Sequence, residues 1–164
     1  MEKQISRLEA FLLSTILVAI TAYIGSFFTT RNISTWYLTI NKPAFLPLNF
    51  VFPIVWTILF ILIGISFYLL LTSNITHLKS RTTINIAKSL FVAQLVFNVL
   101  WCYLFFEAHL LFLASIEIII LEVLILFTII YFYKISKASA YFLIPYALWV
   151  LFATVLTISV SILN

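Results

Sequence analysis

Residues 36–60, WYLTINKPAFLPLNFVFPIVWTILF, decide how the chain is interpreted. The segment holds three of the four prolines of the chain, Pro43, Pro47 and Pro53, among many aromatic residues. Proline fixes its own backbone dihedral φ and restricts the residue before it to extended shapes. The first half is therefore predicted to be a stiff connection that is not helical, and the second half opens a long apolar run.

The composition identifies lipid as the solvent of the chain. Of 164 residues, 65% are apolar and 9% are charged, and the mean hydropathy is +1.22. Soluble domains carry about 25% charged residues, and one of this length could not hide so much apolar surface from water. We expect a single membrane domain over residues 1–164. The net charge of +4 is spread over short loops, so no nucleic-acid partner is expected.

Five apolar runs are long enough to cross a bilayer, whose hydrocarbon core needs about 20 residues of helix. They cover approximately residues 8–28, 51–72, 87–106, 110–133 and 138–162. A membrane barrel is excluded because the runs are too long for barrel strands and lack strict two-residue alternation. The predicted fold class is an all-α membrane protein, a bundle of five transmembrane helices.

Basic residues predict the orientation in the membrane. Seven of the nine lie before the first span, between the second and third, or between the fourth and fifth: Lys3, Arg7, Lys79, Arg81, Lys88, Lys134 and Lys137. The positive-inside rule then places the N-terminus in the cytoplasm, and places the C-terminus and the loop of residues 29–50 outside.

Polar side chains inside the spans are candidates for function. Gln94, Asn98 and Trp101 share one face of the third helix. Amides in hydrocarbon need partners. Two interpretations remain open, either hydrogen bonds between helices or a polar anchor inside an aromatic cavity.

Two acids lie in the fourth span. Glu117 and Glu122 are five residues apart, about 140° around a helix, so they do not form a paired-carboxylate site. Glu122 lies near mid-span and is either neutral and hydrogen-bonded or functional.

His77 and His109 have no metal-ligand neighbours at useful spacing, so no metal site is expected. No arrangement for nucleophilic catalysis can be assembled either.

Four segments in order resemble the translocator protein family, also called tryptophan-rich sensory proteins or TspO/MBR. They are residues 36–60, AQLVFNVLWCYLFF at 93–106, ASIEIIIL at 114–121 and SKASAYFLIPYALWVLFATVL at 136–156. The resemblance covers about residues 23–164. It implies a five-helix bundle, usually a homodimer, with a ligand pocket open toward the first loop.

The resemblance also implies a ligand and its site. Members of the family bind porphyrins and related tetrapyrroles. At matching positions the ligand-binding residues are Trp36, Tyr37, Pro43, Phe52, Trp56, Phe60, Asn98, Trp101, Tyr146, Trp149 and Ala153. Trp56 and Trp149 match tryptophans tied to porphyrin breakdown and are the catalytic candidates. The stiff first loop is expected to act as a lid over this pocket, with Asn98, lid amides or Lys42 receiving the propionates.

We therefore expect an integral membrane protein, of a bacterial cell membrane, that binds a porphyrin- or haem-type tetrapyrrole. It is expected to act as a sensor, carrier or regulator of porphyrin metabolism. No cofactor is required, and the expected partners are membrane lipid, the porphyrin-type ligand and a second copy of the chain. Two alternatives remain open: an enzyme of light- and oxygen-dependent porphyrin degradation, and a small transporter, which Glu122 motivates weakly.

Overall fold

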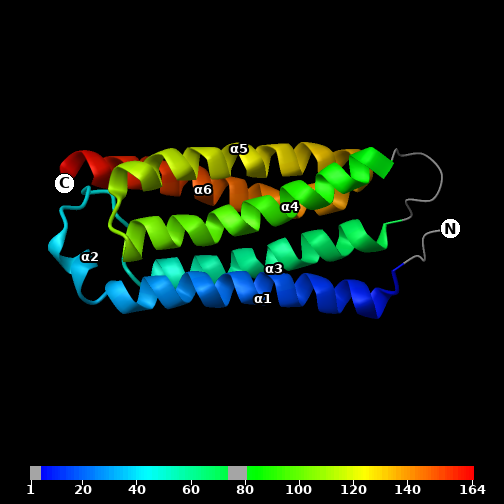
Figure 1. Cartoon of the computed structure of the whole chain (residues 1–164), viewed down its shortest axis with the longest axis horizontal. Helices are drawn as coiled ribbons and strands as arrows, with labels where there is room; N and C mark the ends of the chain where they lie inside the picture. Colours follow the sequence, from blue (N-terminus) through cyan, green and yellow to red (C-terminus); the bar gives the residue numbers. More distant parts are fainter. Residues whose placement is uncertain (1–4, 74–80) are drawn as a thin grey trace.

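The structure, a computed structural model, describes residues 5–73 and 81–164 (Figure 1). Within these ranges the chain is helical and contains no strand. Five long helices are joined by a short helix and a π-helical turn. The elements are α1 (Arg7–Asn32), α2 (Trp36–Thr39), α3 (Val51–Thr72), α4 (Arg81–Cys102), η1 (Tyr103–Glu107), α5 (Leu111–Ile135) and α6 (Lys137–Leu163).

The prediction of five membrane-spanning helices is confirmed, with α4 and η1 together forming the third span. α1 ends at Asn32 and α4 begins at Arg81, so both extend several residues beyond the predicted apolar runs. These polar ends lengthen the helices past the hydrocarbon core into the headgroup region. Lys3, His77 and Lys79 lie outside the described residues. The predicted orientation of the termini stays a prediction.

The first loop differs in part from the expected extended segment. Trp36–Thr39 forms one helical turn, and extended backbone begins at Ile40, whose ψ is 150°. A proline restricts only itself and the residue before it, so the first proline, Pro43, leaves the segment before Lys42 free to be helical.

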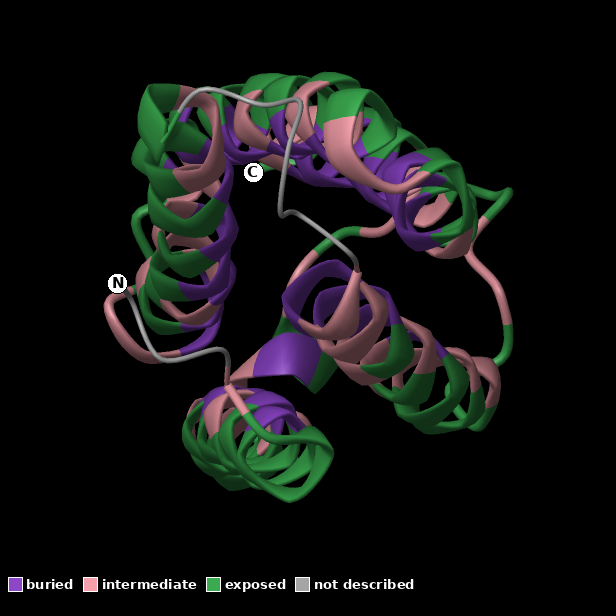
Figure 2. Cartoon of the chain, turned by 90° about the vertical axis from the view of Figure 1, so that its right-hand side faces the viewer, coloured by how far each residue is buried: buried purple, intermediate pink, exposed green. Residues whose placement is uncertain are grey.

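The five long helices form a ring, which Figure 2 shows from the N-terminal end. Going round it, α1 packs on α3, α3 on α6, α6 on α5, α5 on α4 and α4 on α1. Buried residues face the centre, and exposed residues cover the outside. The outer surface is rich in large apolar side chains, such as Phe11, Ile61, Leu126 and Leu148. The bundle is therefore suited to a hydrocarbon surround.

The half of the bundle away from α2 is filled. The rings of Phe67, Phe91 and Phe132, from α3, α4 and α5, form a stack with centroid distances of 4.0 and 5.8 Å. Beside them, the Ser66 hydroxyl donates to the Ser139 carbonyl at 2.7 Å, and the Ser139 hydroxyl donates to the Ser66 carbonyl. Such small hydroxyl residues let α3 and α6 approach closely and bond across the interface.

Candidate functional site

The opposite half of the bundle contains a cavity of about 380 Å³. It lies at the end where α2 and the C-terminus meet (Figure 1). Its walls come from α1, α2, α3, α4, η1 and α6, and from Asn49 in the first loop. Small-molecule pockets are typically ~300–1,000 Å³ and mostly apolar. The cavity therefore has the size and character of a ligand site.

Most residues selected from the sequence lie on this cavity. Eight of the eleven line it: Tyr37, Phe52, Trp56, Phe60, Asn98, Trp101, Trp149 and Ala153. They come from four helices that are far apart in the chain, so the fold brings them together. Trp36, Pro43 and Tyr146 are not part of the lining.

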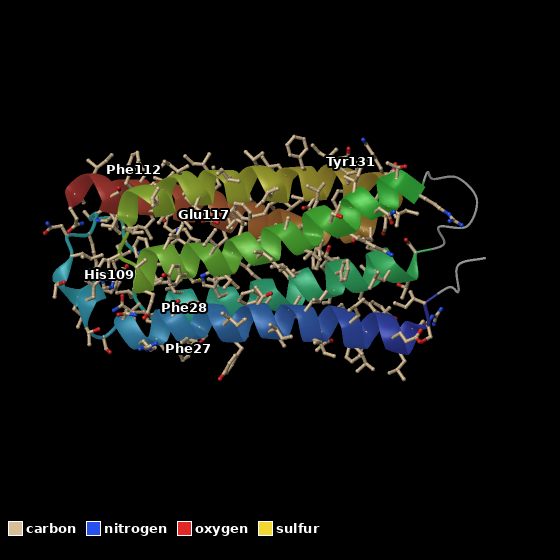
Figure 3. All side chains as sticks on the ribbon, in the orientation of Figure 1. Phe27, Phe28, His109, Phe112, Glu117 and Tyr131 are labelled. Atoms are coloured by element: carbon tan, nitrogen blue, oxygen red, sulfur yellow. The ribbon has the colours of Figure 1, made fainter. Side chains whose placement is uncertain are left out.

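Trp36 is turned toward His109 instead of the cavity. Its ring stacks on the His109 ring with centroids 4.0 Å apart and meets Phe105 edge-on at 5.9 Å. His109 follows η1 with a positive φ of 57°, at the end of the bundle that holds α2 (Figure 3). This stack fixes α2 against the end of the third span. Pro43 is half-buried in the loop beyond α2.

Tyr146 lies behind the cavity wall. Its side chain is fully buried, and its ring meets Trp56 at a centroid distance of 6.2 Å. Its hydroxyl accepts a hydrogen bond of 3.2 Å from the Asn98 amide nitrogen. Tyr146 is thus placed to orient Asn98, whose side chain lines the cavity. This bond confirms the hydrogen-bonding interpretation between helices for Asn98.

Three indole rings dominate the walls. Trp56, Trp101 and Trp149 lie on α3, α4 and α6, and each contacts a further cavity aromatic, Phe60, Phe105 and Phe52 respectively. The indole N–H groups of Trp101 and Trp149 are buried and have no hydrogen-bond partner among the described residues. Buried donors are normally paired. The two nitrogens have almost no accessible surface, so it is the rings and not the N–H groups that face the cavity.

The cavity wall holds no acidic or basic side chain among the described residues. Hydroxyls of Thr29 and Thr30 also line it, but they donate to carbonyls of their own helix, at 2.9 and 2.8 Å. The arrangement can stack a flat apolar molecule and offer it a few hydrogen bonds. The ionisable side chains on this wall, among the described residues, are the Tyr37 phenol and the Cys102 thiol.

The remaining polar groups of the spans lie elsewhere. Gln94, Glu117 and Glu122 are not part of the cavity lining. Figure 3 shows Glu117 on α5, within the bundle, and α5 contributes no residue to the cavity. Both Glu117 carboxyl oxygens and both Gln94 amide atoms are buried and have no partner among the described residues.

The contribution of α1 was not predicted from the sequence. A stripe of small or short side chains on this helix lines the cavity, Ala22, Gly25, Ser26, Thr29 and Thr30, and Ile33 follows just past the helix end. Their spacing of three and four residues places them on one helical face. This spacing was the signal that the sequence offered, but the tryptophan-centred resemblance gave no reason to select it.

The sequence analysis also missed the π-helical turn η1. The Ala108 amide donates to the Tyr103 carbonyl at 2.8 Å, five residues back. The wider turn leaves the consecutive Phe105 and Phe106 both buried, and both line the cavity. It also brings the Glu107 carboxylate to 3.0 Å from the Asn32 amide nitrogen of α1. Single π turns within helices are frequent at functional sites.

The first loop closes the end of the cavity. Tyr37 is buried against Phe105 and Phe106, and burial raises the pKa of its phenol. The Lys42 ammonium lies 4.6 Å from the centroid of the Tyr37 ring. Beyond it, the Asn41 backbone amide donates to the Asn164 side chain at 2.9 Å, and Asn164 returns a bond to the Asn41 carbonyl at 3.0 Å. The loop is thus fastened to the end of α6.

Replacing Asn41 with alanine is expected to loosen this fastening. The substitution removes the 3.1 Å bond from the Asn41 side-chain amide to the Leu163 carbonyl. A hydrogen bond contributes about 1 kcal/mol net, so the amides of residues 36–41 should exchange with deuterium about fivefold faster. Thr39→Ala is the control, because the Thr39 hydroxyl bonds only within α2, to the Trp36 carbonyl. Unchanged exchange in Asn41→Ala would show that the side-chain bond to Leu163 does not hold the loop, and that the backbone bonds to Asn164 and the ring contacts of α2 are sufficient.

Comparison with known proteins agrees with this architecture. The family model described as the TspO/MBR family matches residues 13–163. The chain is 39% identical to the tryptophan-rich protein TspO of Archaeoglobus fulgidus, over 87% of this chain and 88% of that one. It is 33% identical to the protein of the same name from Chlorobaculum tepidum, over 87% of each chain. It is 26% identical to the human translocator protein, over 82% of this chain and 78% of that one. The chain belongs to the TspO/MBR family of integral membrane proteins.

Proposed function

We propose that this membrane protein binds a tetrapyrrole in the cavity beneath the first loop and acts as a sensor, carrier or regulator of porphyrin metabolism. The observation that carries the proposal is the convergence of Trp56, Trp101 and Trp149 on one cavity. Porphyrins are flat, aromatic and largely apolar, so offset stacking on indole faces suits the macrocycle.

The polar groups of the site suit the edge of such a ligand. The carboxylate of a porphyrin propionate is a strong acceptor, and charge-assisted hydrogen bonds are about twice as strong as neutral ones. The amide of Asn98, whose side chain lines the cavity, is the candidate inside it. Lys42, whose ammonium lies 4.6 Å from the centroid of the Tyr37 ring, is the candidate for a second propionate.

The described cavity wall holds no carboxylate, imidazole or ammonium group, which favours binding over hydrolytic chemistry. The transport alternative was motivated by Glu122, and it is weakened because Glu122 does not line the cavity. Among the relatives, names range from tryptophan-rich sensory protein in Cereibacter sphaeroides to translocator protein in humans. These names belong to those proteins, and they leave both sensing and carrying open for this chain.

The test is titration of the purified protein with protoporphyrin while tryptophan fluorescence is recorded. Saturable quenching at micromolar ligand is expected. Trp149→Phe should weaken binding by about three- to tenfold, because a phenylalanine ring keeps only part of the stacking area of the indole. Leu148→Phe is the control, since Leu148 is an exposed neighbour on α6 that does not line the cavity. Linear, unsaturable quenching would end the proposal.

The same samples distinguish binding from light-dependent degradation. Porphyrin absorbance is followed under illumination with wild-type protein and with Trp56→Phe/Trp149→Phe. Faster loss of absorbance with wild-type protein than with the double variant, at equal occupancy, would assign the two indoles a chemical role. Equal rates leave binding as the function.

A further inference from the structure

A second hollow of the molecule lies on the lipid-facing side of α1 and α3. This groove has a volume of about 780 Å³. From α1 it is lined by Phe11, Ser14, Thr15, Val18, Ala19 and Ala22. From α3 it is lined by Thr57, Phe60, Ile61, Gly64, Ile65, Tyr68 and Leu69. We refer to it below as the α1–α3 groove.

The groove adjoins the cavity. Ala22 and Phe60 line both hollows. From the α1 side the groove is lined from Phe11 to Ala22, and the cavity from Ala22 to Ile33, just past the end of the helix. The cavity lining includes exposed residues of the same seam, Ser26 and Thr30 of α1 and Pro53 of α3. The cavity therefore reaches the surface between α1 and α3, next to the Ala22 end of the groove.

The groove offers an occupant apolar contacts and few polar groups. The Ser14 hydroxyl donates to the Phe11 carbonyl at 3.0 Å, and the Thr57 hydroxyl donates to the Pro53 carbonyl at 2.7 Å. Both donors are thus satisfied within their own helices. Hydroxyls that are bonded within their own helix do not need a hydrogen bond from a ligand. The surface favours hydrocarbon over a polar or charged molecule.

Gly64 keeps the floor of the groove open. A Cβ atom built on Gly64 would meet only the Val18 Cγ2 atom, at 4.0 Å, which is an ordinary contact. Close helix packing therefore does not require glycine here. Gly25 contrasts with it, because a Cβ there would lie 3.3 Å from the Cys102 sulfur. Position 64 therefore accepts a methyl group, and a larger side chain there would extend into the groove that Gly64 lines.

The groove is long enough to hold an alkyl chain. At ~1.5 Å per residue, α1 from Phe11 to Ala22 is about 17 Å long. The middle of α1, which spans Arg7–Asn32, falls between these two residues, so the groove crosses the middle of the span. A molecule whose head occupied the cavity and whose chain followed the groove would therefore extend its chain along α1 and α3 into the apolar middle of the membrane.

We propose that the α1–α3 groove binds the long hydrocarbon tail of the same ligand whose flat ring system occupies the cavity. The inference rests on the proposed function and narrows it to a class, tetrapyrroles esterified with a long alkyl or isoprenoid alcohol. Such a ligand reaches the cavity from the bilayer, through the seam between α1 and α3. The first loop then closes the end of the site and does not serve as its entrance.

The experiment uses a pair of probes with the same ring, protoporphyrin and its monoester with hexadecan-1-ol. Both are titrated into the protein in lipid nanodiscs, and the ratio of their dissociation constants is compared between variants. This comparison cancels the partition of each probe into lipid. Gly64→Phe fills the groove, while Gly64→Ala adds only the Cβ that fits. Val155→Phe places the same phenylalanine side chain at an exposed site of α6 outside both hollows.

The expected result is a preference for the ester in wild-type protein that falls at least tenfold in Gly64→Phe. Gly64→Ala and Val155→Phe should keep it, and the affinity for protoporphyrin itself should change less than threefold in all variants. An equal preference in wild type and Gly64→Phe would overturn the inference while leaving the proposed function intact. Failure of protoporphyrin to bind wild-type protein at all would instead refute the proposed function, and the inference with it.

Two other occupants give distinct results, and either would overturn the inference. If a membrane lipid fills the groove, native mass spectrometry should show a phospholipid retained by wild-type protein and lost from Gly64→Phe, without any preference for the ester. If a second copy of the chain fills it, Gly64→Phe should change the oligomeric mass, and Val155→Phe should not.

Discussion

Replacing Ala153 with phenylalanine is expected to lower the affinity for protoporphyrin at least about 100-fold, or ~2.8 kcal/mol. Ala153 lies on α6, one turn beyond Trp149, and both line the cavity. A ring in place of its methyl group would occupy the space between the indoles that a macrocycle needs. A close-packed wall does not make room for a ligand of fixed shape, so the loss should be larger than that from removing any one contact.

Two further variants separate occlusion from misfolding. Ala153→Val fills less of the cavity and should give an intermediate loss, whereas misfolding would not be graded in this way. Leu151→Phe adds a ring two residues away on the exposed side of α6, outside the cavity, and should bind as wild type does. Titration followed by tryptophan quenching measures all three, with thermal unfolding as the check on folding. Wild-type affinity in a folded Ala153→Phe protein would place the ligand elsewhere.

The sequence predicts the helices well because membrane spans are set by length and apolarity alone. With no water in the bilayer core, a long apolar run has few options other than a helix. The ends of α1 and α4 were less predictable, since the polar residues beyond Phe28 and before Ala87 sit in a region that tolerates both helix and loop. The helical turn α2 was not predicted, because the restriction that Pro43 imposes on Lys42 was extended to residues 36–41, which Pro43 does not constrain.

The polar and tryptophan side chains Asn98 and Trp101 stand out in an apolar span, and both line the cavity. The other six selected residues that line it came from the resemblance to the family, because an aromatic or alanine residue in a span does not by itself indicate a cavity. The orientation of Trp36 could not be predicted, because it depends on His109, which is 73 positions away and is positioned by the π turn before it. Tyr146 shows the same limit: position on a helix face does not tell whether a side chain enters a cavity or supports its wall.

The largest effect on stability is expected far from the cavity, at Phe91. Its ring is fully buried and stacks on Phe67 and Phe132, which join α3, α4 and α5. In water, Phe→Ala in a core costs ~3–5 kcal/mol, part of it from transferring the ring out of water. In a membrane the unfolded helices remain in lipid, so the transfer contribution is largely absent and packing remains. A residual void of roughly 100 Å³ at ~24 cal/mol per Å³ then costs about 2.4 kcal/mol.

Titration of the folded protein with sodium dodecyl sulfate, followed by circular dichroism, measures this loss in Phe91→Ala. Val92→Ala is the matched control on the same helix, because Val92 is 44% exposed to the lipid side and should cost less than about 0.5 kcal/mol. A loss equal to that of the control would mean that the stack is not the main contact holding the three helices together. The affinity for protoporphyrin should stay within threefold of wild type, because none of the three stacked rings lines the cavity. The stack of rings joins the helices in one half of the bundle, and the cavity lies in the other half. Stability and ligand affinity should therefore depend on different residues.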